Sequence, residues 1–157
     1  MSTEEQVGHL LTGRGWRIAV AETTTGGLIC HRLVSVPGSS KYVERGIVAY
    51  SRAAKLDLPG VSEDLLSRFG AVSPEAALAL AEGIRRLAGV EVGLAETGIA
   101  GPIRGRSPKP VGEAHIALSL PSGTRAEERL FHGERIDIQR QIAQRALEML
   151  VECLGEL

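Results

Sequence analysis

The chain has 157 residues, 43% of them hydrophobic and 24% charged, with a formal net charge of −1 at pH 7. This length predicts a single domain with a core of its own. The balanced charge and the 3% aromatic content argue against a surface for nucleic acid or acidic lipid, so we expect a small-molecule partner.

The sequence contains no pattern typical of export or of metal binding. Its first six residues are polar and acidic, and no run of about 18 apolar residues occurs, so we expect a cytoplasmic protein. Cys30 and Cys153 lie far apart with no ligand spacing, which favours buried, reduced thiols. The four histidines are equally scattered, and we expect structural or solvated roles for them, with no metal site and no cofactor. They are His9, His31, His115 and His132.

The first third of the chain reads as helix, strand, helix and strand. Apolar residues at helical spacing predict a helix from Glu4 to Thr12, ended by glycines. A strand at about 17–21 and a helix at about 25–34 follow, then a break at 36–40 and a strand at 42–50.

The junction between the first strand and the second helix is the most informative segment. It reads Glu22-Thr23-Thr24-Thr25-Gly26-Gly27, three hydroxyl residues followed by two glycines. The first turn of a helix has unpaired backbone N–H groups, and glycines allow a ligand to approach the backbone closely. We therefore predict an anion or oxyanion site here. Alternatively, the threonines only cap the helix, and Glu22 either orients a ligand or caps the N–H groups that follow it.

The middle of the chain continues the alternation of helices and strands. A helical turn begins at Ser51, and Ser62 predicts a helix through about Phe69. Ser73-Pro74-Glu75 is a strong helix start, so a helix to about Ala88 is expected. A strand at 92–97 then leads into a long aperiodic loop, 98–110, of the kind that is often functional.

The last third predicts two strands at 111–120 and 125–131, joined by a hairpin turn, and a final helix at 136–154. Arg125, Glu127 and Arg129 alternate in the second of these strands and suggest a solvated edge. The element order predicts an α/β fold, a single three-layer α/β/α domain with a mixed sheet, parallel first and antiparallel at the end. Ligands of such sheets bind at the carboxyl ends of the parallel strands, where both special loops lie.

A hydroxyl nucleophile in the first loop needs a proton acceptor. Three segments could form one site: Thr23 to Gly27, Tyr50 to Lys55 and Gly98 to Gly112. No histidine lies in them, which leaves Lys55, one helical turn beyond Ser51. Lys55 would need a pKa lowered to roughly 7–8, by burial and by a cation such as Arg52. Tyr50 could hydrogen-bond the amine or direct the proton. Taken alone, Lys55 could equally be a solvated helix residue, and Tyr50 could be an aromatic residue at the end of a strand.

Lys109 with the loop glycines suits a phosphate, and Arg104 and Arg106 can be plain surface charge.

Ordered motifs along nearly the whole chain resemble one known family. They include Ala21 to Gly27, the turn 36–40, Gly46 to Lys55, Thr97 to Pro102, Lys109 to Gly112 and Phe131 to Arg135. These segments resemble the C-terminal domain of the competence/damage-inducible CinA proteins, also found as stand-alone nicotinamide-nucleotide amidohydrolases. The family's serine is Thr23 here, its glycine pair after Pro102 is Ile103-Arg104, and Glu113 stands where it usually has threonine.

The resemblance implies hydrolysis of the carboxamide of nicotinamide mononucleotide (NMN) to nicotinic acid mononucleotide and ammonia in pyridine nucleotide salvage, without metal. Thr23 would be the nucleophile, Lys55 the general base and Tyr50 an assisting hydroxyl. The nucleotide would be held from the first loop, the Arg52 turn and the long loop. The positions are Glu22, Thr24, Thr25, Gly26, Gly27, Arg52, Thr97, Gly98, Ala100, Gly101 and Lys109. Domains of this kind commonly form homo-oligomers. The alternative function is a catalytically silent nucleotide-binding or scaffold module of the same fold.

Overall fold

The computed structural model describes residues 1–157 and contains one five-stranded sheet with the strand order β2-β1-β3-β4-β5. The strands are β1 (Ile18–Glu22), β2 (Val43–Val48), β3 (Val92–Gly98), β4 (Glu113–Leu120) and β5 (Gly123–Leu130). β1 pairs in parallel with β2 and β3, whereas β3–β4 and β4–β5 are antiparallel. The predicted mixed sheet is therefore confirmed.

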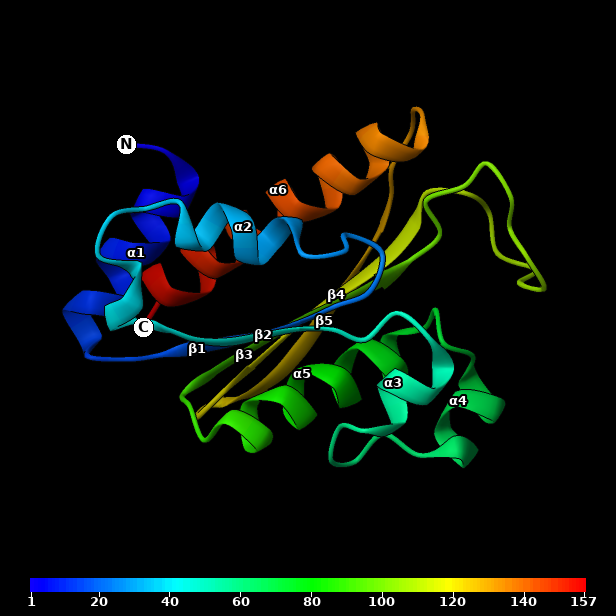
Figure 1. Cartoon of the computed structure of the whole chain (residues 1–157), viewed down its shortest axis with the longest axis horizontal. Helices are drawn as coiled ribbons and strands as arrows, with labels where there is room; N and C mark the ends of the chain where they lie inside the picture. The colour runs from blue at the N-terminus through cyan, green and yellow to red at the C-terminus, as the bar shows by residue number, and fades with distance from the viewer.

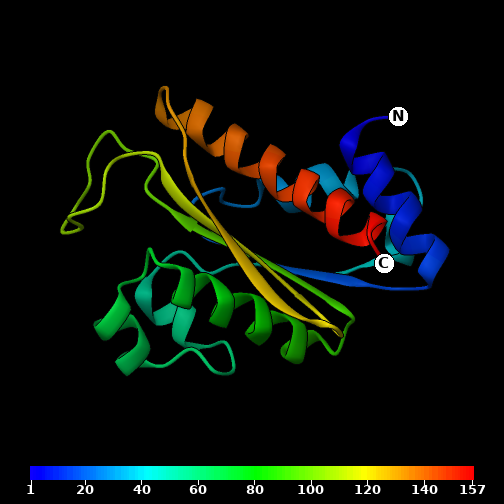
Figure 2. The same cartoon turned by 180° about the vertical axis from the view of Figure 1, so that it is seen from behind.

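Helices cover both faces of this sheet and complete the three predicted layers (Figure 1). One layer holds α1 (Thr3–Arg14), α2 (Leu28–Val34) and α6 (Arg135–Gly155). The other holds α3 (Arg52–Leu56), α4 (Glu63–Phe69) and α5 (Pro74–Ala88), and a short 3-10 helix, Ser39–Lys41, precedes β2. The reverse view shows α6 running along the sheet on the same side as both chain termini (Figure 2). No helix combines the length and the apolar character needed to cross a membrane.

Alternation along the buried strands divides the core into two clusters. Ile18 and Val20 of β1 face the α1/α2/α6 layer, whereas Ala19 and Ala21 face α5. The α5 side uses small residues because this helix lies close to the sheet. A Cβ added to Gly93 would lie 2.2 Å from the carbonyl oxygen of Ala81, so only glycine allows this approach.

The observed elements differ from the predicted ones mainly at their ends. The second helix begins at Leu28 rather than Thr25, because Gly26 and Gly27 have φ angles of 60° and 107° and form a left-handed turn before it. β2 ends at Val48, so Tyr50 lies in the loop that follows. β4 begins at Glu113 instead of residue 111.

β5 is an edge strand as predicted, but its alternating charged residues are not simply solvated. The guanidinium of Arg145, on α6, bonds both carboxylate oxygens of Glu127, at 2.7 and 2.8 Å, and Arg129 bonds the same carboxylate at 2.9 Å. Arg125 reaches Cys153 on the same helix. This row therefore attaches α6 to the sheet edge. Both cysteines are free, Cys153 buried and Cys30 half-buried.

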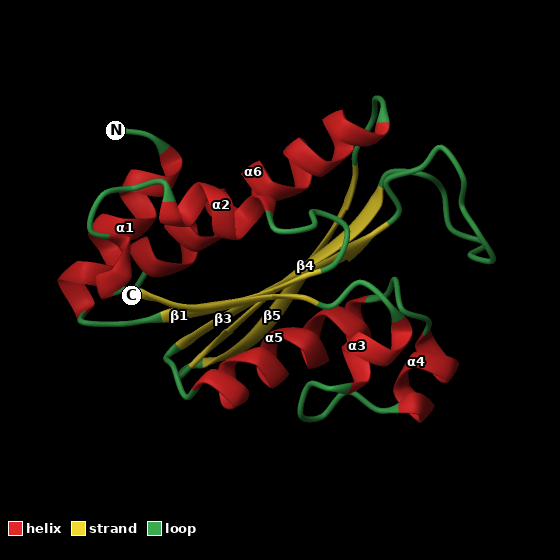
Figure 3. Cartoon of the chain, viewed as in Figure 1, coloured by secondary structure: helices red, strands yellow, loops and turns green.

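The connections after β1, β2 and β3 leave the sheet at the same end, because the carboxyl ends of parallel strands lie together. The connection after β3, 99–112, is drawn as a long loop that extends beyond the layers (Figure 3). These three connections, with the last residues of β1 and β3, contain every residue predicted for the site.

Candidate active site

A cavity of about 390 Å³ lies where the three connections meet. Thr23, Tyr50 and Lys55, the three predicted catalytic residues, all line it. Of the predicted binding residues, Thr24, Thr97, Gly98, Ala100 and Gly101 line it as well. The remaining lining residues are Ala71, Val72, Ile99, Ile103, Arg104, Gly105, Ser107 and Arg135.

Thr23 is held tightly at the end of β1. Its side chain is buried, and its backbone N–H donates to Oε1 of Glu96 at 2.6 Å. Its Oγ1 donates to the backbone carbonyl of Glu96 at 2.9 Å and lies 3.3 Å from the hydroxyl of Thr24. The hydroxyl is thus fixed at the cavity wall, with its proton directed to the neighbouring strand.

Lys55 has the environment that a basic amine requires. It is only 6% exposed, and its Nζ donates a single hydrogen bond, to the backbone carbonyl of Tyr50 at 2.7 Å. No carboxylate oxygen lies within ion-pair distance of this nitrogen. Burial lowers the pKa of Lys55, Glu96 opposes this effect, and the charge of Arg52 adds to it. An ammonium here would have one protein acceptor for its three N–H groups, so the site shifts the protonation equilibrium of Lys55 toward the neutral amine.

Tyr50 contacts Lys55 through its backbone only. Its side chain is 61% exposed, and its hydroxyl accepts a hydrogen bond from Arg135 Nη2 at 3.2 Å. The hydrogen bond that we predicted between the Tyr50 side chain and the amine is therefore not formed in this structure.

Arg135 is a lining residue for which the sequence analysis assigned no role. Its Nη1 donates to the carbonyl of Gly101 at 2.7 Å, so this first residue of α6 joins the long loop to Tyr50. Its position in the motif from Phe131 to Arg135 was the available signal. Arg104, read as possible surface charge, also lines the cavity, so two arginine residues belong to the same cavity as Thr23.

Glu22 occupies the helix start that we expected to bind an anion. Its Oε1 accepts from the N–H groups of Gly27 and Ile29, at 3.1 and 2.9 Å, and its Oε2 accepts from that of Cys30 at 2.9 Å. The capping alternative therefore describes Glu22, and neither Gly26 nor Gly27 lines the cavity. The N–H of Thr24 has no hydrogen bond within the protein and belongs to a lining residue, so it is a free donor next in sequence to Thr23.

Glu96 is the second residue that the sequence analysis missed. It is fully buried, and its Oε1 accepts from the N–H of Thr23 and from the N–H of Thr25 at 3.0 Å, and lies 2.9 Å from the Thr25 Oγ1. Its Oε2 has no hydrogen-bond partner. Burial raises the pKa of Glu96 in spite of these bonds. A carboxyl group inside the apolar run of β3 was the signal in the sequence.

The three remaining predicted binding residues, Thr25, Arg52 and Lys109, do not line the cavity and have partners elsewhere. Thr25 bonds Glu96 as described above. Arg52 is paired with Glu63 at 2.7 Å and bonds Ser67 at 2.9 Å. The Lys109 ammonium bonds the backbone carbonyl of Val72 and lies 3.5 Å from Glu113. Thr97 is fixed to the opposite wall by a 2.7 Å bond from its Oγ1 to the carbonyl of Ala71.

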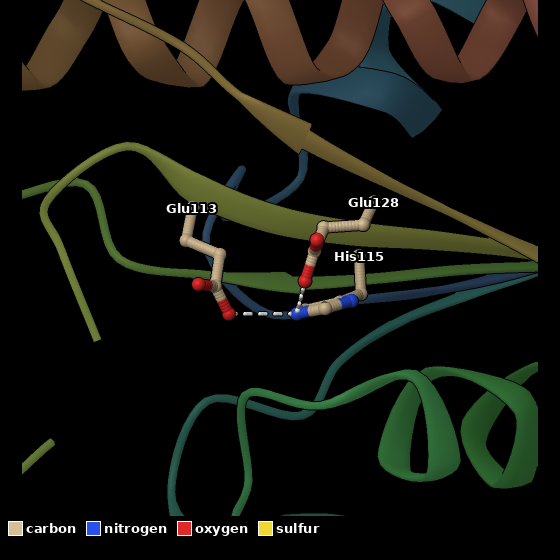
Figure 4. A group of neighbouring side chains, drawn as sticks. All are labelled: Glu113, His115 and Glu128. Carbon is tan, nitrogen blue, oxygen red and sulfur yellow. Dashed lines mark hydrogen bonds and ion pairs between the residues drawn. The ribbon is translucent and has the colours of Figure 1, made fainter. Parts of the chain in front are cut away.

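One group of side chains has the composition of a metal site (Figure 4). His115 Nε2 lies 2.9 Å from Glu113 Oε2 and 3.6 Å from Glu128 Oε1, and the three potential ligand atoms lie within 4.8 Å of one another. His115, expected to be structural or solvated, is 1% exposed and lies between these carboxylates. The Lys109 ammonium already supplies a positive charge to Glu113, so the cluster is accounted for as an ion-pair network.

Comparison of the chain with known proteins identifies its family. The chain is 50% identical over 153 residues to a CinA-like protein of Syntrophobacter fumaroxidans, a match that covers 98% of the chain and 36% of the relative. It is 48% identical over 146 residues to a putative competence-damage inducible protein of Desulforamulus reducens, covering 93% and 35%. The chain thus spans about a third of the length of these relatives.

Solved structures match over the whole chain. A CinA superfamily protein from Klebsiella pneumoniae superposes with a TM-score of 0.94 at 28% identity, covering all of both chains. The competence/damage inducible protein CihA from Agrobacterium tumefaciens superposes with a TM-score of 0.89 at 38% identity, covering 99% of each. The model of the CinA C-terminal domain matches residues 1–154, and the chain belongs to this family.

Proposed function

We propose that this domain hydrolyses the carboxamide of nicotinamide mononucleotide to nicotinic acid mononucleotide and ammonia. The observation that carries the proposal is the meeting of Thr23 and Lys55, from separate connections, at one cavity in which the Lys55 amine is buried beside a single acceptor. The CinA C-terminal domain family is associated with this deamidase activity, which supports the same conclusion.

The mechanism is acyl transfer through a threonine ester. Thr23 Oγ1 attacks the carboxamide carbon while Lys55 accepts the hydroxyl proton, and the N–H of Thr24 donates to the oxyanion. Collapse of the tetrahedral intermediate breaks the C–N bond, and the Lys55 proton leaves with the amine as ammonia. Water then attacks the ester, Lys55 accepts its proton and returns it to Thr23, and nicotinic acid mononucleotide leaves.

The phosphate of the substrate would bind to arginine rather than to lysine. Arg104 and Arg135 line the same cavity as Thr23, and guanidinium groups bind phosphate through two parallel hydrogen bonds. Lys109, predicted for this role, is engaged by Val72 and Glu113. The cavity volume of about 390 Å³ lies within the range of roughly 300–1,000 Å³ usual for small-molecule sites.

Ammonia release from nicotinamide mononucleotide by the purified chain tests the proposal. We expect turnover by the wild type and none by Thr23→Ala, and a loss of at least about 10²-fold in Lys55→Met, as for removal of a general base. Unchanged turnover in Thr23→Ala would refute the threonine ester.

The alternative, a silent nucleotide-binding module, has one observation in its favour. The Thr23 hydroxyl donates to the carbonyl of Glu96, and its extra methyl restricts rotation toward Lys55. Calorimetry separates the two functions, because binding of nicotinamide mononucleotide without ammonia release supports the silent module.

A further inference from the structure

The Thr25 hydroxyl lies between two buried carboxyl groups. Its Oγ1 is 2.5 Å from Oε1 of Glu22 and 2.9 Å from Oε1 of Glu96, and both glutamates are fully buried. A hydroxyl carries one hydrogen, so it can donate fully to only one of these oxygens. If both glutamates were ionised, the Thr25 oxygen would also contact a second carboxylate oxygen with no hydrogen between the two atoms, and this contact would be repulsive. The geometry requires one additional proton in this group.

The surroundings decide which glutamate carries that proton. Glu22 accepts from three backbone N–H groups, those of Gly27, Ile29 and Cys30, and both of its oxygens have partners. Glu96 accepts from two backbone N–H groups, those of Thr23 and Thr25, and both bonds are made to Oε1. Glu96 has one oxygen without any partner, and an unpaired oxygen is far less costly on a neutral acid than on a buried anion. A proton on Glu96 Oε1 donates to Thr25, and Thr25 donates to Glu22, so every short contact then contains a hydrogen.

Few other titratable groups lie on the elements that pack around Glu96 and could take up this proton. The neighbour of Glu96 on β4 is Ile116, and α6 packs against this part of the core through Ile138 and Ile142. The Cys30 thiol on α2, close to Glu22, stays protonated because burial raises its pKa. Lys55 is the one cation whose charge state responds to Glu96.

We propose that Glu96 is a positioning residue that carries a proton in the resting protein, donated through the Thr25 hydroxyl to Glu22, and that as a neutral acid it adds no negative charge to the site of the Lys55 amine. The role in catalysis rests on the proposed amidohydrolase function. An ionised Glu96 would attract a proton to Lys55 and remove the base, whereas a neutral Glu96 holds the backbone of Thr23 and Thr25 without adding a negative charge.

Infrared spectroscopy of the full chain tests the proton directly, because the carbonyl stretch of a protonated carboxylic acid lies apart from the amide and carboxylate bands. We expect one such band at pH 7 in the wild type, shifted in heavy water and missing in Glu96→Gln. Glu127→Gln is the matched control and retains the band, since Arg145 lowers the pKa of Glu127 to about 2 and keeps it ionised. A wild type without the band, or Glu96→Gln with it, overturns the proposal.

Two further measurements test the bridge and the connection to Lys55. In Thr25→Val the band remains but moves to higher frequency, because the acid loses its acceptor; an unmoved band refutes the bridge through Thr25. In Glu96→Gln the acid limb of kcat/KM against pH stays in place, because a neutral amide replaces a neutral acid. A shift of that limb by one pH unit or more to lower pH would show that Glu96 is ionised and overturn the proposal. Since the infrared band needs no turnover, a protein that has the band but releases no ammonia refutes the amidohydrolase function alone.

Discussion

The Oγ1 of Thr23 donates its hydrogen bond to the backbone carbonyl of Glu96, 2.9 Å away, and not to Lys55. The resting side chain is therefore bound to the neighbouring strand, and attack on a substrate requires its proton to be redirected toward the amine. Because threonine is branched at Cβ, this redirection is restricted in χ1.

Replacing Thr23 with serine should increase the rate. Serine keeps the hydroxyl and loses the methyl, and removal of a rotational restriction worth about 1 kcal/mol corresponds to a gain of about fivefold. The measurement is kcat for ammonia release by Thr23→Ser and the wild type. A serine variant slower than the wild type would mean that the methyl group positions the nucleophile.

The activity should fall at low pH as Lys55 becomes protonated. Burial lowers the pKa of Lys55 below the 10.5 of a free lysine, so the acid limb of kcat/KM should lie below that value. A profile that rises steadily up to the pKa of an ordinary lysine would show that the amine is charged at neutral pH.

The same burial should make Lys55 a destabilising residue. Because its pKa is lower folded than unfolded, the unfolded chain binds more protons between the two values, and stability rises with pH through that window. Below the unfolded value Lys55→Met should therefore gain about 1 kcal/mol of unfolding free energy while losing activity. Urea unfolding at pH 7 measures this gain. A loss of stability would show that the hydrogen bond to Tyr50 outweighs the burial of the amine.

Arg135 should contribute to recognition of the phosphate and not to bond cleavage. Loss of a charge-assisted hydrogen bond worth about 1.5–3 kcal/mol should raise KM for nicotinamide mononucleotide roughly 10- to 150-fold in Arg135→Ala, with a smaller effect on kcat. Nicotinamide riboside, which has no phosphate, is the matched control, and its KM should change little. Equal losses with both substrates would assign Arg135 to positioning Tyr50 and the long loop.

The attachment of β5 to α6 should weaken in acid. Arg145 lowers the pKa of Glu127 to about 2, so the stabilisation is present above the unfolded value near 4.5 and is lost as the pH falls toward 2. Since the pair is partly exposed, Glu127→Gln should lose only about 1 kcal/mol at pH 7. Thermal unfolding at pH 7 and pH 2.5 should show this difference shrinking in acid. Glu148→Gln, whose partner oxygen lies 3.4 Å from Arg145, is the milder control.

The fold could be predicted because its signals are local. Ser73-Pro74 begins α5 where the capping pattern predicted, and the order of strands and helices indicated the layers and the mixed sheet. Helix and strand ends were less certain: the glycines before Leu28 were read as part of a helix, although their positive φ angles exclude them from it.

The site could be predicted only in part, because several partners lie far apart in sequence. Loops after parallel strands meet at one edge, so the meeting of Thr23 with Lys55 followed from the topology. The interaction of Glu96 with Thr23 and that of Arg135 with Tyr50 depend on side-chain contacts across 73 and 85 residues, which no local pattern contains. Lys109 was assigned to phosphate by residue type, whereas its neighbours engage it elsewhere.

Because the Glu22 carboxylate occupies the start of α2, the segment that holds the Thr23 hydroxyl differs from the segments available to recognise the rest of a substrate. Glu22 bonds the N–H groups at the start of α2, so under the proposed function the turn after β1 would hold the Thr23 hydroxyl without using that helix terminus for the ligand. Recognition of the rest of the substrate would then fall to the 99–112 loop and the start of α6, which lie outside the sheet. Exchange of that loop between relatives should therefore alter which amide is accepted while the chemistry stays intact, an evolutionary route to new substrates that leaves the core sequence untouched.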